Sequence, residues 1–216
     1  MKTSITILLF LAATFLARAE LMVGASLEWL ADTSADVGVF QVTKSHQKTD
    51  SEFELTFRLQ KALKGNAPQV ATSSYWVRLP KGSDLPTVDP DDCFLLFFKP
   101  NDKDFLHVAH LINLSTVQNG GMESVAINSK FETLTEEAQI LKVVKQRINA
   151  FPKATTTKWQ EYPDSRFDVE VPTDSPAFKV LFGGSTCYLL VPDDLKTEKQ
   201  KKPNKPEMAT PRKPSD

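Results

Sequence analysis

An unbroken apolar run, Cys93–Phe98, constrains the fold of this chain most strongly. Turn signals bound the run on both sides, with Asp-Pro-Asp-Asp at 89–92 and Pro-Asn-Asp at 100–102. A short run that is rich in phenylalanine predicts a β-strand buried on both faces, because both sets of alternating side chains are apolar. The other strands must then pack around this one.

Several other segments alternate apolar and polar residues, which is the pattern of a strand with one buried face. The clearest is 53–60, whose apolar set is Phe53, Leu55, Phe57 and Leu59. Further strands are expected at 36–42, 74–79 and 105–114, with turns at 46–50 and at Gly65-Asn66. Antiparallel strands joined by turns predict a small closed or nearly closed barrel, because closure hides the strand edges.

The helical part is smaller. Ser26 is placed to cap a short helix ahead of the first strand. A longer amphipathic helix, capped by Thr135 and stopped by Pro152, is predicted by apolar residues at spacings of three and four: Leu134, Ala138, Leu141, Val144 and Ile148. Strands at 166–171 and 186–191 flank a short helix at 177–182.

The predicted fold class is mainly β with minor α (α+β). A small antiparallel OB-like barrel is expected over 20–128, and a C-terminal helix-and-strand extension over 129–192 is expected to pack on it. Whether that extension forms a domain of its own stays open at this stage.

The N-terminal segment has the features of a secretory signal peptide. Lys2 precedes an apolar stretch at 5–16 and the small-x-small site Ala17-Arg18-Ala19, so 1–19 should be removed and the mature chain should begin at Glu20. An uncleaved anchor is the alternative, but the apolar stretch is shorter than the ~20 residues that span a bilayer. We therefore expect a secreted or periplasmic protein that is not transmembrane after cleavage.

Charge and tail composition bear on partners. The 26 basic and 27 acidic residues nearly balance, which disfavours nucleic acid as a ligand. The segment 193–216 is rich in lysine and proline and has little to bury, so we expect a disordered tail. That tail is either solvated and without a role, or an electrostatic tether to an anionic polymer of the envelope.

Four segments of the first half form a series: 35–42 (ADVGVFQV), the strand 53–59, 62–65 (ALKG) and 92–97 (DCFLLF). Together they resemble the barrel of netrin-module and tissue-inhibitor-of-metalloproteinase-like domains, an OB-type fold. The chain is also similar to uncharacterised exported bacterial proteins, some of which carry a later segment like 171–177 (VPTDSPA) and 183–192 (GGSTCYLLVP). The resemblance implies a fold more than an activity. Inhibitors of that family use an N-terminal cysteine, which Glu20-Leu21-Met22 lacks, so no functional residue carries over.

The sequence contains no recognisable catalytic, metal or cofactor motif. The histidines are His46, His107 and His110; His107 and His110 fall on opposite faces of a predicted strand, so these two cannot share a metal. The segment 183–187 lacks the final glycine and the following helix of a nucleophile elbow. The acidic turns around 89–92 and 102–104 lack the EF-hand spacing.

Two sets of residues remain as candidates. Cys93 and Cys187 both lie in predicted strands, so they are either buried free thiols or, if those strands are neighbours, a possible disulfide. Trp76 lies near Arg78 and Lys81 beside a proline-rich loop, and barrels of the OB type bind ligands along such surfaces. Core packing is the alternative for this tryptophan.

The function expected from the sequence is an exported, non-catalytic module that binds a protein or glycan of the cell envelope through barrel loops at 75–90. One alternative is a structural envelope protein tethered by its basic tail, and a second is a hydrolase. No cofactor is expected. The identity of the ligand and the oligomeric state stay open.

Overall fold

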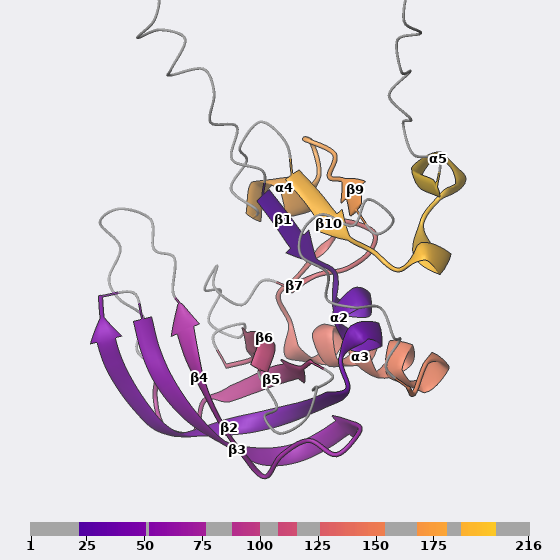
Figure 1. Cartoon of the computed structure of the whole chain (residues 1–216). Coiled ribbons are helices and arrows are strands. Elements are labelled where there is room, and N and C mark those ends of the chain that lie inside the picture. The colour runs from indigo at the N-terminus through magenta and orange to yellow at the C-terminus, as the bar shows by residue number, and fades with distance from the viewer. Residues whose placement is uncertain are drawn as a thin grey trace, which may run out of the picture.

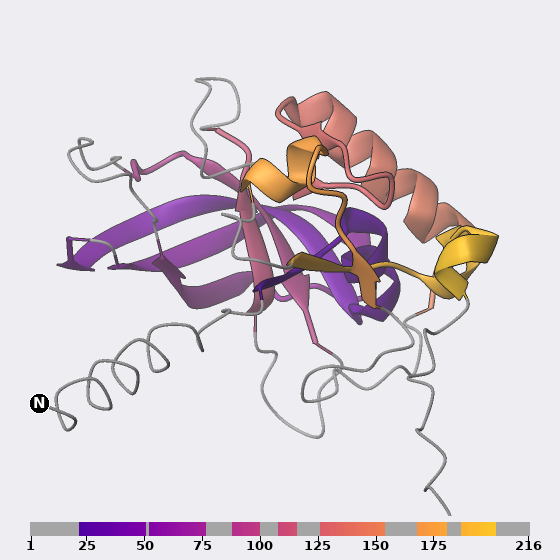
Figure 2. The same ribbon diagram turned by 90° about the horizontal axis from the view of Figure 1, so that it is seen from above.

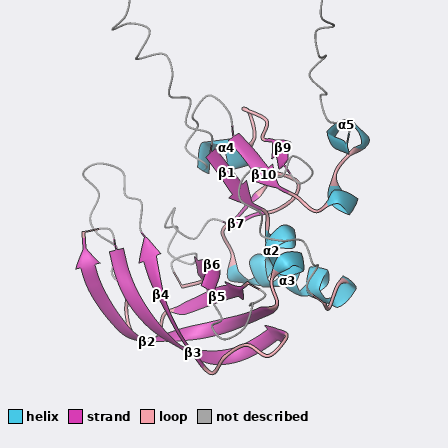
Figure 3. Ribbon diagram, in the orientation of Figure 1, coloured by secondary structure: helices cyan, strands magenta, loops and turns pink. Residues whose placement is uncertain are grey.

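The computed structural model describes residues 22–50, 52–76, 88–99, 108–115, 126–153, 168–180 and 187–201. Its strands are Met22–Ala25 (β1), Asp36–Thr49 (β2), Glu52–Lys64 (β3), Val70–Trp76 (β4), Cys93–Phe98 (β5), Val108–Asn113 (β6), Ala126–Ile127 (β7), Thr133–Leu134 (β8), Asp168–Glu170 (β9) and Cys187–Leu190 (β10). Its helices are Leu27–Thr33 (α2), Glu137–Ala150 (α3), Pro176–Val180 (α4), Glu198–Lys201 (α5) and the 3-10 helix Asp193–Leu195 (η3). The fold is mainly β with a smaller helical part, as predicted (Figures 1 and 3).

The large sheet has the strand order β4-β3-β2-β5-β6, and each neighbouring pair is antiparallel. β2, β3 and β4 follow one another along the chain, and β5 then returns to lie beside β2. This order, with the fourth strand next to the first, is a Greek key. The edge strands β4 and β6 approach each other. No hydrogen-bonded pair joins them in the described part of the chain, so the expected closed barrel is not found there.

β-Bulges bend the two longest strands. The register of β2 on β3 shifts between Val37 and Gly38, between Val39 and Phe40, and again between Val42 and Lys44. Such shifts add a residue to one strand and increase its local twist, so the hairpin curves instead of lying flat. β2 also runs further than predicted: residues 46–49, expected in a turn, still pair with β3.

β5 is buried on both faces, as its apolar run predicts. Phe94, Leu96 and Phe98 point into a core that they share with apolar side chains of β2, β3 and β4. Leu95 and Phe97 point the other way, into a second core that residues of α2 and α3 complete. The central strand therefore separates two cores, one inside the curved sheet and one beneath the helices.

The two main helices differ in how well the sequence predicts them. α2 begins at the predicted cap, where the Trp29 backbone N–H donates to Ser26 Oγ at 3.2 Å. The N-cap of α3 is Glu136 and not Thr135, and Ala138, expected in the core, is exposed. Val144 and Ile148 are buried as predicted, and Leu141 packs against the same core. Ile140 and Arg147 are also buried, which the predicted stripe did not include.

A small sheet joins two segments that are far apart in the sequence. β1 runs parallel to β10, and β9 pairs with the other edge of β10. The sequence predicts β9 and β10 but not β1, which forms by pairing with β10 from the other end of the chain. Seen from above, this sheet lies over the helix-covered end of the large sheet and not over the far tip of β2 and β3 (Figure 2).

The described chain continues beyond the last predicted strand. Residues 193–201, assigned to a disordered tail by the sequence, form η3 and α5. Lys196 is buried, and its Nζ lies 2.9 Å from Asp193 Oδ1. The expected tail is thereby shortened to 202–216, which lies outside the described residues, as does the predicted leader 1–19. Among the described helices, none has the length and apolar character needed to cross a membrane.

Candidate functional site

The residues predicted to bind a ligand are only partly within the described structure. Trp76 is the last residue of β4 and pairs in register with Glu52 at the start of β3. Arg78 and Lys81 belong to 77–87, outside the described residues. The structure does locate the point where this connection leaves β4. It lies at the end of the large sheet where the β2–β3 hairpin turns.

Beside that point, the outward face of β2, β3 and β4 is exposed to solvent. Strand alternation places it opposite the inward-pointing Phe53, Leu55 and Phe57. We call this surface the open face. Its residues form five cross-strand rows: Thr49, Glu52 and Trp76; His46, Glu54 and Ser74; Lys44, Thr56 and Thr72; Gln41, Arg58 and Val70; and Lys61, which pairs with Val39.

The open face begins where the cover provided by the helices ends. Val37 and Val39, at the start of β2, pack in the core beneath α2 and α3. Further along the same side of β2, Lys44 and His46 are exposed. Figure 1 shows α2 and α3 at one end of the curved sheet, with the tips of β2, β3 and β4 extending away from them. The same sheet face is thus core at one end and solvent-facing surface at the other.

The open face is rich in hydrogen-bonding groups and in cations. Within the part of the chain that the structure describes, Lys44, Arg58 and Lys61 have no ion-pair partner, and they fall in successive rows. Glu54, in contrast, is paired with Lys48 at 2.7 Å, and the hydrogen bond from Lys48 lowers the pKa of the Glu54 carboxyl. Such a surface suits a polar, negatively charged ligand.

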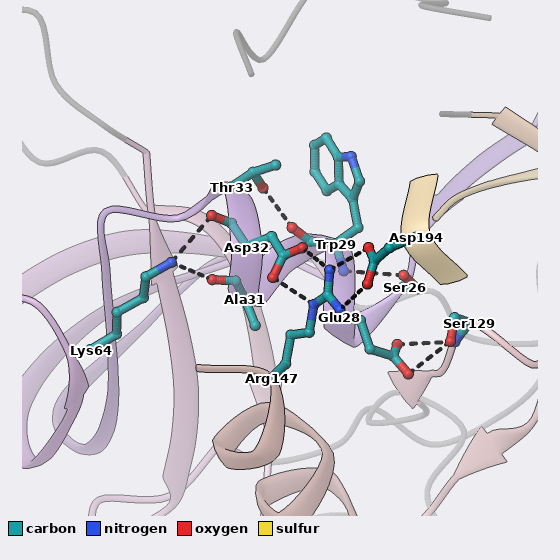
Figure 4. A network of polar contacts seen from close by, with 10 residues as sticks. All are labelled: Ser26, Glu28, Trp29, Ala31, Asp32, Thr33, Lys64, Ser129, Arg147 and Asp194. Carbon is teal, nitrogen blue, oxygen red and sulfur yellow. Dashed lines mark hydrogen bonds and ion pairs between the residues drawn. The ribbon is translucent and has the colours of Figure 1, made fainter. Parts of the chain in front are cut away.

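A second concentration of polar groups is buried where α2, α3 and η3 meet (Figure 4). Nε of Arg147 donates to Asp32 at 2.7 Å, and Nη2 donates to the other oxygen of the same carboxylate. Nη1 and Nη2 also donate to Asp194, at 2.7 and 2.8 Å. The guanidinium carbon lies 4.1 Å from the centre of the Phe151 ring. One arginine thereby joins two carboxylates from distant parts of the chain.

Burial and hydrogen bonding shift the pKa of Arg147 in opposite directions. The side chains of Arg147 and Asp32 are only 8% and 6% exposed, whereas that of Asp194 is 51% exposed. Burial on its own lowers the pKa of Arg147. The hydrogen bonds to Asp194 and Asp32 outweigh it and raise the pKa above its ordinary value. The guanidinium therefore stays charged inside the protein.

Lys64 approaches α2 from β3. Its Nζ donates to the backbone carbonyls of Ala31 at 2.6 Å and Asp32 at 3.2 Å. These carbonyls belong to the last turn of α2, where the helix dipole favours a cation. Lys64 is 4% exposed. Burial lowers the pKa of its ammonium group, although the charges of Asp32 and Asp36 act in the raising direction.

The buried network connects structural elements from distant parts of the chain. Glu28 of α2 accepts hydrogen bonds from the backbone N–H and the hydroxyl of Ser129, both at 3.0 Å. α2 is thus tied to β3, α3, η3 and the β7–β8 turn, while both oxygens of Asp32 are occupied by Arg147. The sequence held one signal for this role: Arg147 follows Val144 by three positions, on the buried stripe of α3.

The remaining polar candidates do not form a site. His46 lies exposed on β2, and His110 lies on β6 with its ring 6.4 Å from that of Phe97. His107 is outside the described residues. Across the described ranges, no three His, Cys, Asp or Glu side chains are grouped so that they could hold a metal ion.

Cys93 and Cys187 are both free thiols. Cys93 belongs to β5 in the large sheet and Cys187 to β10 in the small one, so the two strands are not the neighbours that a disulfide would need. Burial, helped by the charges of Glu137 and of Asp92 and Asp91, raises the pKa of the Cys93 thiol. A raised pKa makes a thiol a poor nucleophile at neutral pH.

Comparison of the chain with protein-family models, with curated proteins and with solved structures found no match.

Proposed function

We propose that this chain is an exported, non-catalytic binding module that holds its ligand on the open face and on the adjoining connection 77–87. The open face itself carries the proposal. It presents hydroxyl and amide groups together with Lys44, Arg58 and Lys61 in successive rows. Val70, opposite Arg58, is 61% exposed and adds an apolar contact within the same surface.

The strand order supports an OB-like barrel as the scaffold. OB folds are five-stranded, partly open Greek-key barrels, and they bind along the face of their second and third strands. The second and third strands of the Greek key here are β3 and β4, which supply much of the open face. The approach of β4 to β6 is what near-closure requires.

The predicted ligand residues extend this surface. The connection that follows Trp76 carries Arg78 and Lys81 and leaves β4 beside Glu52, at the edge of the open face. A ligand that lies on the outer rows of β3 and β4 is therefore within reach of this connection. We propose that Trp76, Arg78 and Lys81 contribute to the same binding surface.

A binding role is favoured over a hydrolase by how the buried charges are used. Arg147 and Asp32 neutralise each other, and Lys64 is engaged with helix carbonyls.

A structural envelope role for the basic tail is the other alternative. Residues 193–201 are held against the protein by Asp194, so a tether could begin only at 202. Deleting 202–216 tests it: unchanged retention in envelope fractions would exclude the tether.

Site-specific photo-crosslinking tests the proposed function. A photoreactive amino acid is placed at Thr72, which is exposed on the open face, in the full chain produced with its own leader and a tag. The matched control carries it at Gln146, which is exposed on α3. We expect one dominant adduct from Thr72 and none from Gln146. Equal adducts at both positions, or none at Thr72, would refute binding on the open face.

A second variant addresses the connection. Combining Trp76→Ala, Arg78→Ala and Lys81→Ala in the chain that carries the probe at Thr72 should reduce the adduct strongly without unfolding the protein. An undiminished adduct would restrict the binding surface to the strands and remove these three residues from it.

A further inference from the structure

We infer that the open face binds an anionic polysaccharide that bears carboxylate groups. The inference rests on the proposed function and names the chemical class of its ligand. It is carried by the placement of Lys44, Arg58 and Lys61, by the hydrogen-bonding groups between them, and by what the surface lacks.

Strand geometry gives the spacing of these cations. Successive rows lie about 7 Å apart, because two residues separate them along a strand. Lys44 is in the row of Thr56, Arg58 is in the next row, and Lys61 follows in the row of Val39. The three charges therefore form a track about 14 Å long across β2 and β3. A repeating polymer can meet such a track with successive units, whereas a small anion would meet one cation at a time.

The charge along the track is available to a ligand. Carboxylates border the track, and each already has a hydrogen-bond donor: Glu54 accepts from Lys48, Asp91 from Gln41 at 2.6 Å, and Glu52 from Ser74 at 3.2 Å. Within the described ranges none of them pairs with the cations of the track. An anionic ligand can thus bind without first displacing an internal ion pair.

The side chains between the cations favour a sugar polymer over other anionic polymers. Proteins that bind single-stranded nucleic acid stack its bases on aromatic rings. Protein partners are usually anchored by buried aromatic or large side chains. The described side chains in the rows of Lys44, Arg58 and Lys61 include no aromatic ring, and Val70 is the one large exposed apolar group among them. His46 and Trp76 belong to rows nearer the β2–β3 turn.

The groups that are present match a hydroxyl-rich chain. Thr72 and Ser74 on β4 are exposed, and Thr56 lies beside Thr72 in register. Their hydroxyls can both donate to and accept from sugar hydroxyls. The cations of the track supply charge-assisted hydrogen bonds to carboxylates, and Val70 can contact the C–H face of a sugar ring.

Binding of the full mature chain to polygalacturonate, with neutral dextran as the uncharged counterpart, tests the inference. We expect binding to polygalacturonate only, and clear weakening between about 50 mM and 0.5 M salt, because screening shortens the reach of exposed charges. The combined variant Lys44→Gln, Arg58→Gln and Lys61→Gln should bind about tenfold more weakly, since each exposed contact contributes only a few-fold.

A control variant removes three positive charges, as many as the first variant, from positions outside the open face. Lys130→Gln, Lys142→Gln and Lys179→Gln replace lysines that are exposed outside the open face, and we expect their combination to bind like the unmodified chain. Circular dichroism melting checks that both variants fold. Equal loss in the two variants would show that net charge alone attracts the polymer, which overturns the inference.

The outcomes also separate this inference from the proposed function. Tighter binding to polyaspartate or to a single-stranded oligonucleotide than to polygalacturonate would overturn the polysaccharide class. If polygalacturonate does not bind but the Thr72 adduct is still obtained, the ligand class is wrong and the binding module stands. If both fail, the proposed function fails with it.

Discussion

Replacing Arg147 with alanine tests whether the buried network holds the C-terminal segment on the rest of the protein. The change removes every hydrogen bond that Arg147 donates to Asp32 and Asp194. It leaves the carboxylate of Asp32, 6% exposed, without its counter-charge. Loss of one partner from a buried pair costs about 3–5 kcal/mol of unfolding free energy, because the remaining charge is neither paired nor well solvated.

Loss of the Asp194 carboxylate should lower the unfolding free energy much less than loss of the partner of Asp32. Asp194 is 51% exposed, and Asp194→Ala leaves the pair between Arg147 and Asp32 intact, so we expect a loss of about 1 kcal/mol or less. Each kcal/mol corresponds to about 2–4 °C for a chain of this size. The melting temperature of the full chain, followed by circular dichroism, should therefore fall by about 6–20 °C for Arg147→Ala and by about 4 °C or less for Asp194→Ala.

A double variant separates the cost of an unpaired charge from the loss of contacts. Combining Arg147→Met with Asp32→Leu removes both charges of the Arg147–Asp32 pair, so this protein should be more stable than Arg147→Ala. The reasoning is wrong if the double variant melts below Arg147→Ala, or if Arg147→Ala and Asp194→Ala lower the melting temperature equally.

Three further predictions follow from single residues. Burial lowers the pKa of Lys64, so its ammonium group holds its proton more tightly in the unfolded chain than in the folded one. The unfolding free energy of the unmodified chain, relative to that of Lys64→Met, should therefore rise as the pH increases from the lowered pKa towards 10.5. Urea titrations at about pH 8 and pH 10 measure it, and a fall between them would contradict the prediction. In the folded chain, Cys93 should react slowly with a thiol reagent and the fully buried Cys187 should not react. In the unfolded chain, both should react without added reductant. If neither reacts after unfolding, the two cysteines form a disulfide. Gly65→Ala should cost about 2–3 kcal/mol in urea unfolding, because φ is +63° there and a Cβ would collide with Asp36 Oδ1; a loss below about 0.5 kcal/mol would show that the turn relaxes.

The sequence pattern was sufficient to predict an element wherever a few neighbouring residues determine its structure. The strand Cys93–Phe98 is found with the predicted bounds and with apolar partners on both faces. Ser26 caps α2, and Gly65 takes positive φ at the predicted turn. In each case the physical cause is contained within a few neighbouring residues, such as alternating side chains, a capping hydroxyl or a missing Cβ.

The alternation of apolar and polar residues along β2 does not predict which side chains lie on the open face. A period-two alternation continued through β2 would place Lys44 on the same side as Phe40 and Val42, which are buried. The register shift between Val42 and Lys44 reverses this alternation, so Lys44 faces solvent beside Thr56. A bulge is a property of the paired strands, and the sequence of one strand does not reveal it.

By itself, the sequence determined the class of the fold, most of its strands and the central place of β5, because these depend on periodicity along the chain. Tertiary structure decided that Arg147 of α3 is buried, that β1 pairs with β10, and that Arg147 holds 193–201 against the protein through Asp194. Arg147 meets Asp32 across 115 positions and Asp194 across 47. The free energy of such contacts arises only when distant segments are brought together and water is excluded, and no local pattern encodes it.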